Sequence, residues 1–269
     1  MPVFEHDGIR FNYRESGNGL PFIFQHGLTA DLTQTFGVFT PPAGVRMIGF
    51  DCRNHGLTRP YTNERVGLAA FADDLAGLMD HLNIERAVIG GISMGSAIAL
   101  NFALRNASRV MALVISRPAW LEGPLPQNVE IYRTIAGLIV QHGPQAAQAI
   151  FKESSLYGST LRDSPAVAGT LLNAFNLPDI EHRIVLLDRI PRDQPYASLG
   201  ELAALRVPTL VLANRQDPVH PYEVGEAIAA AIPGAEFMEL TAKSVSPDQH
   251  NADVQRCIEG FLKRRFLNG

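Results

Sequence analysis

The stretch VIGGISMGSAIAL, residues 88–100, runs from an apolar segment through a cluster of small residues into a helical pattern. Its centre, GISMG at residues 91–95, fits the frame G-x-S-x-G with Ser93 in the middle. A strand that reverses directly into a helix forces its tip residue into φ > 0, and the residues two positions away must lack bulk. Gly91 and Gly95 meet that requirement. The pattern therefore predicts Ser93 as a nucleophile raised above a sheet, with an ordinary turn serine as the alternative.

The composition is that of a folded globular protein without a strong charge. The chain has 269 residues, 46% of them hydrophobic, and a formal net charge of −4, so nucleic acid is not an expected partner. Cys52 and Cys257 show neither metal-ligand spacing nor a framework of pairs, which favours a reducing compartment and no metal. Without an apolar signal region or a run of about eighteen apolar residues, a soluble cytoplasmic protein with no membrane partner is expected.

Short apolar runs alternate with helical patterns along most of the chain. A hairpin around the Asp-Gly dipeptide at 7–8 opens it, and buried strands are predicted at 21–25, 45–51, 86–92, 110–116 and 209–214. Residues 68–82 repeat leucine and phenylalanine at helical steps, as an amphipathic helix does. Strand, helix and strand in this order predict an α/β protein with a mostly parallel sheet.

One long segment breaks the alternation. Residues 117–208 are dominated by helical patterns and are too long for a loop. We interpret them as a helical cap, or lid, inserted into a core made of residues 1–116 and 209–269. The alternative is that these helices belong to the layers that flank the sheet.

A serine hydroxyl needs a base to remove its proton and a carboxylate to orient that base. The base is expected in a loop after a late strand, where the carboxyl ends of parallel strands gather. His250 stands in KSVSPDQHNADV, residues 243–254, after the β-type run 235–240 and before the final helical pattern, and it is preferred among eight histidines. His220, in DPVHPYE at 217–223, is interpreted as a packing or capping residue.

The preferred acid is Asp217, which follows the predicted strand at 209–214 and is held in a turn by Pro218. A helix or turn cap is its alternative role. Asp248 is a rival because it lies two residues from His250, although that proximity gives poor geometry for orienting the ring. Glu122 is the only carboxylate just after the strand at 110–116.

Attack on a carbonyl creates an oxyanion that backbone N–H groups stabilise. One donor is expected to be the amide of Met94, directly after the nucleophile. The other is expected in the loop QHGLTAD, residues 25–31, where Gly27 allows close approach and the amide of Leu28 faces the site. His26 is expected to fasten this loop.

The order Ser93, Asp217, His250, preceded by the QHG loop and by FDCRNHGLT at 50–58, resembles the α/β-hydrolase fold superfamily along almost the whole chain. The resemblance implies an eight-stranded, mostly parallel sheet flanked by helices, a cap inserted after the sixth strand, and a triad hydrolase without cofactor. Two positions depart from the pattern, since Asn54 and Asn214 stand where relatives typically carry glycine.

A serine at position 93 argues against haloalkane dehalogenases and epoxide hydrolases, whose nucleophile is an aspartate. The preferred function is hydrolysis of a small carboxylic ester or lactone through an acyl-enzyme, as in related esterases and lactonases. The alternatives are a C–C bond hydrolase, a thioesterase, a perhydrolase, or a receptor-like binding protein with little turnover. The natural substrate and the question of a homo-oligomer stay open.

Two residues near the start of the predicted cap are candidates for substrate binding. Trp120 could line an acyl or alcohol pocket, although ordinary core packing is the alternative. Arg117 could meet a substrate carboxylate, although pairing with an acidic side chain of the protein itself is the alternative that the sequence favours.

Overall fold

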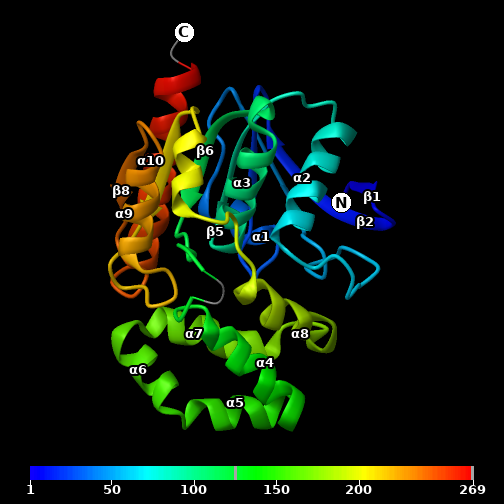
Figure 1. Cartoon of the computed structure of the whole chain (residues 1–269), viewed down its shortest axis with the longest axis vertical. Helices are drawn as coiled ribbons and strands as arrows, with labels where there is room; N and C mark the ends of the chain where they lie inside the picture. The colour runs from blue at the N-terminus through cyan, green and yellow to red at the C-terminus, as the bar shows by residue number, and fades with distance from the viewer. Residues whose placement is uncertain (124–125, 268–269) are drawn as a thin grey trace.

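The computed structural model describes residues 1–123 and 126–267, and one eight-stranded sheet lies at its centre (Figure 1). The strands lie in the order β1-β2-β4-β3-β5-β6-β7-β8. The pairs β1–β2 and β2–β4 are antiparallel, and every other neighbouring pair is parallel. The α/β class and the mostly parallel eight-stranded sheet are thus confirmed. The strands are β1 (Val3–His6), β2 (Ile9–Gly17), β3 (Leu20–Gln25), β4 (Val45–Phe50), β5 (Ala87–Ile92), β6 (Val110–Ser116), β7 (Thr209–Ala213) and β8 (Glu236–Glu239).

The helices fall into two groups. Those that flank the sheet are α1 (Thr33–Val38), α2 (Leu68–His81), α3 (Met94–Arg105), α9 (Tyr222–Ala231) and α10 (Pro247–Leu262). Those between β6 and β7 are α4 (Glu130–His142), α5 (Pro144–Lys152), α6 (Ser155–Asp163), α7 (Pro165–Asn173) and α8 (Ile180–Arg189). Short turns of tighter or wider helix complete the chain: η1 (Ala107–Arg109), η2 (Ala174–Asn176), η3 (Ile190–Arg192), η4 (Leu199–Ala204) and η5 (Lys263–Leu267).

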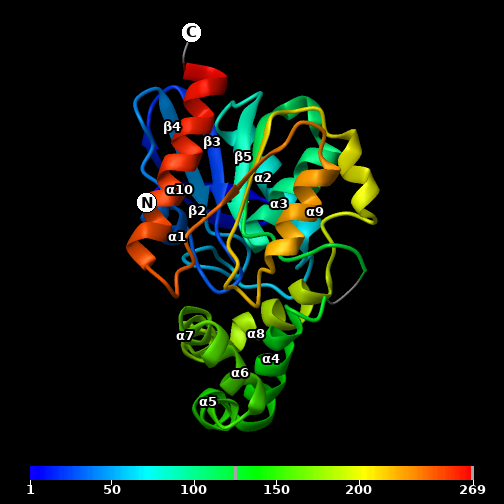
Figure 2. The same ribbon diagram turned by 90° about the vertical axis from the view of Figure 1, so that its left-hand side faces the viewer.

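The two faces of the sheet bury different side chains because successive residues of a strand point to opposite sides. On β3, Phe22 and Phe24 join a core with Ile258 of α10, whereas Ile23 joins a core with Leu75 of α2. Figure 2 shows α10 and α1 on one side of the strands and α3 and α9 on the other. Full burial of each such side chain stabilises the fold by roughly 1.5–3 kcal/mol. A sheet covered on both faces leaves its strand ends as the place for a site.

The helices α4 to α8 stand beyond one end of the sheet (Figures 1 and 2). Their inner faces are apolar, with Phe151, Leu171 and Phe175 fully or almost fully buried. They occupy the part of the chain for which a cap is expected. The boundaries of that cap, at 117 and 208, stay a prediction.

The backbone conformation at position 54 explains why an asparagine can stand where the family pattern has glycine. Asn54 adopts φ +61°, a left-handed conformation that asparagine tolerates better than most residues other than glycine. Its side-chain amide donates to the carbonyl of Thr62 at 2.7 Å, and its side-chain oxygen accepts the amide of Thr62 at 2.9 Å. Asparagine therefore tolerates the left-handed conformation at this position, and its side chain adds these two hydrogen bonds and a third, longer one to the carbonyl of His182 at 3.3 Å.

Candidate active site

Ser93 sits at the tip of a sharp reversal between β5 and α3. Its backbone has φ +56° and ψ −114°, outside the regions that non-glycine residues commonly adopt. A Cβ on Gly91 would lie 2.1 Å from the carbonyl carbon of Gly95, and a Cβ on Gly95 would lie 2.3 Å from the carbonyl oxygen of Gln25. Both positions therefore exclude any side chain, and the steric argument made from the pentapeptide is confirmed.

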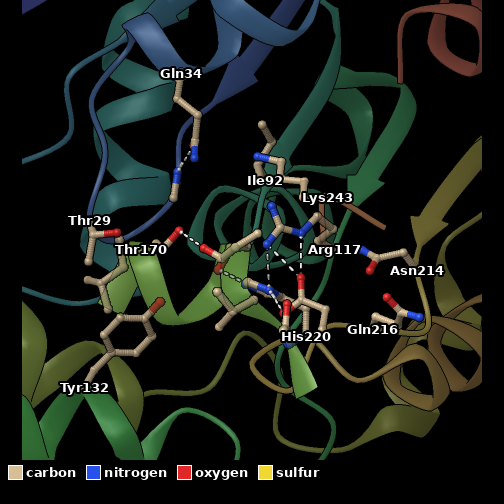
Figure 3. A pocket seen from close by; sticks show the side chains of 17 residues that line it. Thr29, Gln34, Ile92, Arg117, Tyr132, Thr170, Asn214, Gln216, His220 and Lys243 are labelled. Carbon is tan, nitrogen blue, oxygen red and sulfur yellow. Dashed lines mark hydrogen bonds and ion pairs between the residues drawn. The ribbon is translucent and has the colours of Figure 1, made fainter. Parts of the chain in front are cut away.

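The histidine that meets Ser93 is His220. Its Nε2 lies 2.8 Å from the Oγ of Ser93, and its Nδ1 lies 2.9 Å from an oxygen of Asp217 (Figure 3). Asp217 and His220 belong to one turn after β7, in which the amide of His220 contacts both the carbonyl and the carboxylate of Asp217. Carboxylate, imidazole and hydroxyl thus form one continuous line of contacts, the arrangement of a nucleophile with its base and orienting acid.

The charges around the imidazole of His220 decide which of its two nitrogens carries the hydrogen. Burial raises the pKa of Asp217, but the charges and hydrogen bonds of His220 and Arg117 outweigh this effect and hold that pKa well below its usual range. An ionised carboxylate can only accept, so the Nδ1 of His220 carries the hydrogen and its Nε2 offers a lone pair to Ser93. Burial, assisted by Arg117, also lowers the pKa of His220, although Asp217 opposes this. A ring that is neutral at pH 7 has the form of a general base.

Arg117 is a partner of the acid rather than a free cation. Its Nε and Nη2 donate to one carboxylate oxygen of Asp217 at 2.9 and 2.7 Å, and Nη2 also lies 3.1 Å from the Nδ1 of His220. Its backbone has φ +50°, which turns the chain out of β6 directly after the last strand residue. The sequence left two roles open for Arg117, and the structure shows pairing with an acidic side chain.

The expectation that His250 lies against Ser93 is wrong. The sequence pattern predicts that the final helix begins after His250, but α10 begins at Pro247, with Ser246 as its N-cap. His250 therefore lies in the first turn of a helix, where its Nδ1 donates to the carbonyl of Thr241 at 2.8 Å. Burial lowers its pKa to about 4, and it is not among the residues that line the cavity at Ser93. It is a packed histidine with a satisfied hydrogen bond.

Two signals in the sequence could have located the base. The pair Ser246-Pro247 is a typical helix start, with a capping side chain followed by proline at the first helical position. His220 lies three positions after Asp217, with a proline between them, and this is a spacing that one turn brings together. Both signals favour His220 over His250.

The two alternative acids lie elsewhere. Asp248 is exposed in the first turn of α10, and Glu122 accepts the amide of Leu199 at 2.8 Å. Neither contacts the ring of His220, whereas Asp217 does at 2.9 Å. The choice of Asp217 therefore agrees with the geometry.

The loop after β3 passes beside Ser93. A Cβ on Gly27 would lie 3.5 Å from the Cβ of Ser93, and Leu28 lines the same cavity. His26 fastens this loop, because its Nδ1 donates to the carbonyl of Gly27 at 2.9 Å and its Nε2 accepts an amide of the loop after β4 at 3.1 Å. Met94 is the first residue of α3, where amides have no acceptor inside the helix. Two backbone segments with N–H groups thus border the nucleophile.

Ser93 opens into a small cavity of about 70 Å³. The helices α4 and α7 close it from the side opposite the sheet, and the Oγ of Ser164, at the start of α7, lies 2.7 Å from the Oγ of Ser244. Trp120 does not reach this cavity, since its side chain is buried in the core. The wall opposite the triad consists of Tyr132, Ser164, Ala166, Val167 and Thr170.

Within residues 1–123 and 126–267, no three His, Cys, Asp or Glu side chains gather closely enough to hold a metal ion. In the same part of the chain, no helix combines the length and the apolar character that crossing a membrane requires. Cys52 and Cys257 are both buried free thiols.

Comparison with known proteins agrees with this geometry. Residues 21–245 match the family model described as alpha/beta hydrolase fold. A 2-hydroxy-6-oxononadienedioate/2-hydroxy-6-oxononatrienedioate hydrolase of Cupriavidus pinatubonensis is 32% identical over 72% of this chain and 68% of its own. The 3-oxoadipate enol-lactonase 1 of Acinetobacter baylyi is 23% identical over 91% of this chain and 90% of its own. The structure of a thermophilic esterase from Thermogutta terrifontis matches with a TM-score of 0.75 and 27% identity, over 97% of this chain and 96% of that one.

Proposed function

This chain belongs to the alpha/beta hydrolase fold family and is an enzyme of that fold, and we propose that it cleaves a small carboxylic ester or lactone. The observation that carries the proposal is the line of contacts from Asp217 through His220 to Ser93, at 2.9 and 2.8 Å. Esterase and lactonase are the names of two similar proteins, and each name describes hydrolysis at a carboxylic carbonyl.

The proposed reaction has two halves. The Oγ of Ser93 attacks the carbonyl carbon while its proton moves to the Nε2 of His220, and Asp217 stabilises the imidazolium that forms. That proton then passes to the leaving alkoxide, whose bond to the carbonyl carbon breaks and leaves an acyl-enzyme. Water then loses a proton to His220 and attacks the acyl carbon. The bond from that carbon to the Oγ of Ser93 breaks, His220 returns the proton to this oxygen, and the acid is released. For a lactone, the leaving alkoxide stays joined to the acyl group.

The proposed oxyanion hole consists of the amides of Leu28 and Met94. The close approach of the loop after β3 to Ser93 supports the first, and the position of Met94 at the start of α3 supports the second. A donor of this kind typically lowers the barrier by roughly 3–4 kcal/mol.

We also propose that residues 117–208 act as a cap over the site. The cavity of about 70 Å³ is small beside the roughly 300–1,000 Å³ of typical ligand pockets, and α4 and α7 form one of its walls. A substrate with more than a few non-hydrogen atoms therefore needs the cap helices to move away from the nucleophile.

A second candidate function is hydrolysis of a C–C bond next to a ketone. It is favoured by the 32% identical relative, whose name is that of a hydrolase of an oxo-dienedioate. The same three side chains would then act on a carbon leaving group, which must be protonated at carbon rather than at oxygen. Vinylogous diketones discriminate the two functions, since an esterase leaves them intact.

The test of the proposed function combines turnover with labelling of the nucleophile. The wild-type protein is expected to hydrolyse p-nitrophenyl butyrate and to gain the mass of a fluorophosphonate on Ser93, and Ser93→Ala is expected to lose both. A folded wild-type protein that labels slowly without sustained turnover would instead be a binding protein. Turnover that survives in Ser93→Ala would remove Ser93 from the mechanism.

A further inference from the structure

Lys243 lines the same cavity as Ser93 and His220. It comes from the segment between β8 and α10, and Figure 3 shows it on the same side of the site as Arg117. The segment is fixed to the cap, because the neighbouring Ser244 contacts Ser164 at 2.7 Å. Its lysine is thus a built part of the wall rather than a loose surface residue.

The ammonium of Lys243 has no carboxylate partner, by hydrogen bond or ion pair, among residues 1–123 and 126–267. Asp217, the acid nearest to the site, already accepts from Arg117 with one oxygen and from His220 with the other. Arg117 and Asp217 cancel as a pair, so Lys243 leaves one positive charge beside the nucleophile.

We propose that Lys243 binds a carboxylate of the substrate, so that the ester or lactone that this enzyme cleaves is an anion. This inference rests on the proposed function and names the substrate class of that site. A half-buried cation without a partner is costly, and a carboxylate inside the cavity would relieve that cost. By binding this carboxylate, Lys243 would also orient the ester or lactone carbonyl of the substrate relative to Ser93.

The side chains that line the cavity are chemically suited to a singly anionic substrate. Thr170 and Ser164 of the cap and Gln34 of the core add neutral polar groups, whereas Val167 offers an apolar contact. Its lining contains Asp217 as the only carboxylate among the described residues, and that group is fully paired. Nothing in this lining repels an anion.

The proposal has a pH dependence with a definite sign. Burial, together with the nearby charge of Arg117, lowers the pKa of Lys243 to about 8, although Asp217 opposes this shift. The other titratable groups that face it are His220 and His250, whose pKa values are both lowered so that they stay neutral above pH 7. Binding of a carboxylate is therefore expected at pH 7 and should weaken as the pH rises through about 8.

The experiment compares two esters of nearly equal shape. Monomethyl succinate carries a carboxylate where methyl levulinate carries a methyl ketone, and both release methanol. The readout is the ratio of their kcat/KM values at pH 7 and pH 9.5 for wild type, Lys243→Met and Lys243→Arg. The matched control is Lys152→Met, an exposed lysine at the end of α5. Calorimetric binding of succinate to the same four proteins gives a readout that needs no turnover.

We expect the wild type to prefer the anionic ester at least tenfold at pH 7 and to lose most of that preference at pH 9.5. Lys243→Met should lower the ratio 10- to 100-fold at pH 7 and abolish succinate binding, and Lys243→Arg should keep a ratio that no longer depends on pH. Lys152→Met should match the wild type.

Two outcomes overturn the inference: a wild type that prefers methyl levulinate, or a Lys243→Met variant with an unchanged ratio and unchanged succinate affinity. If neither ester is hydrolysed, the proposed function is in question. Succinate binding that depends on Lys243 and on pH still decides the inference in that case.

Discussion

Replacing His220 by Gln tests the assignment of the base, and His250→Gln is its matched control. In the structure, the Nε2 of His220 is the atom that approaches the Oγ of Ser93, at 2.8 Å, whereas the Nδ1 of His250 donates to a backbone carbonyl. A glutamine side chain cannot accept a proton at neutral pH, so His220→Gln removes the general base and the imidazolium that Asp217 stabilises. His250→Gln removes one structural hydrogen bond.

Loss of the base from such a triad typically lowers kcat by about 10⁴-fold or more. At 1.36 kcal/mol per tenfold change, 10⁴-fold corresponds to about 5 kcal/mol of lost transition-state stabilisation. We therefore expect kcat/KM of His220→Gln for p-nitrophenyl butyrate to fall by about 10⁴-fold. For His250→Gln we expect a change of less than about tenfold, because that ring does not line the cavity at Ser93 and its Nδ1 is bonded to a backbone carbonyl.

The assay follows release of p-nitrophenol at pH 7.5, with fluorophosphonate labelling of Ser93 as a second readout and thermal melting as the control for folding. Labelling should slow strongly in His220→Gln, since the same base activates the hydroxyl for phosphonylation. The reasoning is refuted if folded His220→Gln keeps activity within tenfold of the wild type, or if His250→Gln loses as much as His220→Gln.

Three further perturbations have definite signs. Arg117→Gln removes a charge that lowers the pKa of His220, so the acid limb of the kcat/KM profile should move to higher pH; an unmoved limb would contradict the pairing. Gly95→Ala places a Cβ 2.3 Å from a carbonyl oxygen and should lower the free energy of unfolding by at least about 3 kcal/mol. This corresponds to a melting temperature at least about 6 °C lower. The control Gly137→Ala, whose Cβ lies in open space on α4, should leave the melting temperature unchanged or raise it. In the folded protein the pKa of His250 is about 4, below its ordinary 6.5, so its neutral form contributes stability above pH 6.5. This stability is lost as the pH falls from 6.5 to 4, by about 3 kcal/mol at most. The melting temperature of His250→Gln should therefore depend less on pH over that window than the wild type's does, and equal slopes would refute this.

The fold and the nucleophile could be predicted because their signals are local. All five predicted buried strands are strands in the structure, and their ends lie within one residue of the expected ones. They were predicted at 21–25, 45–51, 86–92, 110–116 and 209–214. The strained turn at Ser93 follows from glycines two positions away on each side, a requirement that any chain must meet there. Each of these features depends on residues that are neighbours in sequence.

The base was predicted wrongly because the cue used for it, a histidine after a late strand, fits both His220 and His250. The helix start at Ser246-Pro247 and the short spacing of Asp217 and His220 distinguish the two candidates, but only once that helix is placed so that it begins before His250. Whether a residue lies in a loop or in the first turn of a helix changes its side-chain direction, and α10 starts three residues before His250. The pairing of Arg117 with Asp217 is also a contact across 100 positions, which no local pattern reveals.

The turn that holds both Asp217 and His220 makes the acid and the base a single structural unit. Their mutual distance is set by four consecutive residues, so a shift of this loop relative to β5 moves both groups together and changes only the gap to the serine. Substitutions in the segment between β8 and α10 leave the contact between Asp217 and His220 unchanged. That segment is thereby available to evolution, or to an engineer, for tuning which acyl or alcohol groups the enzyme accepts.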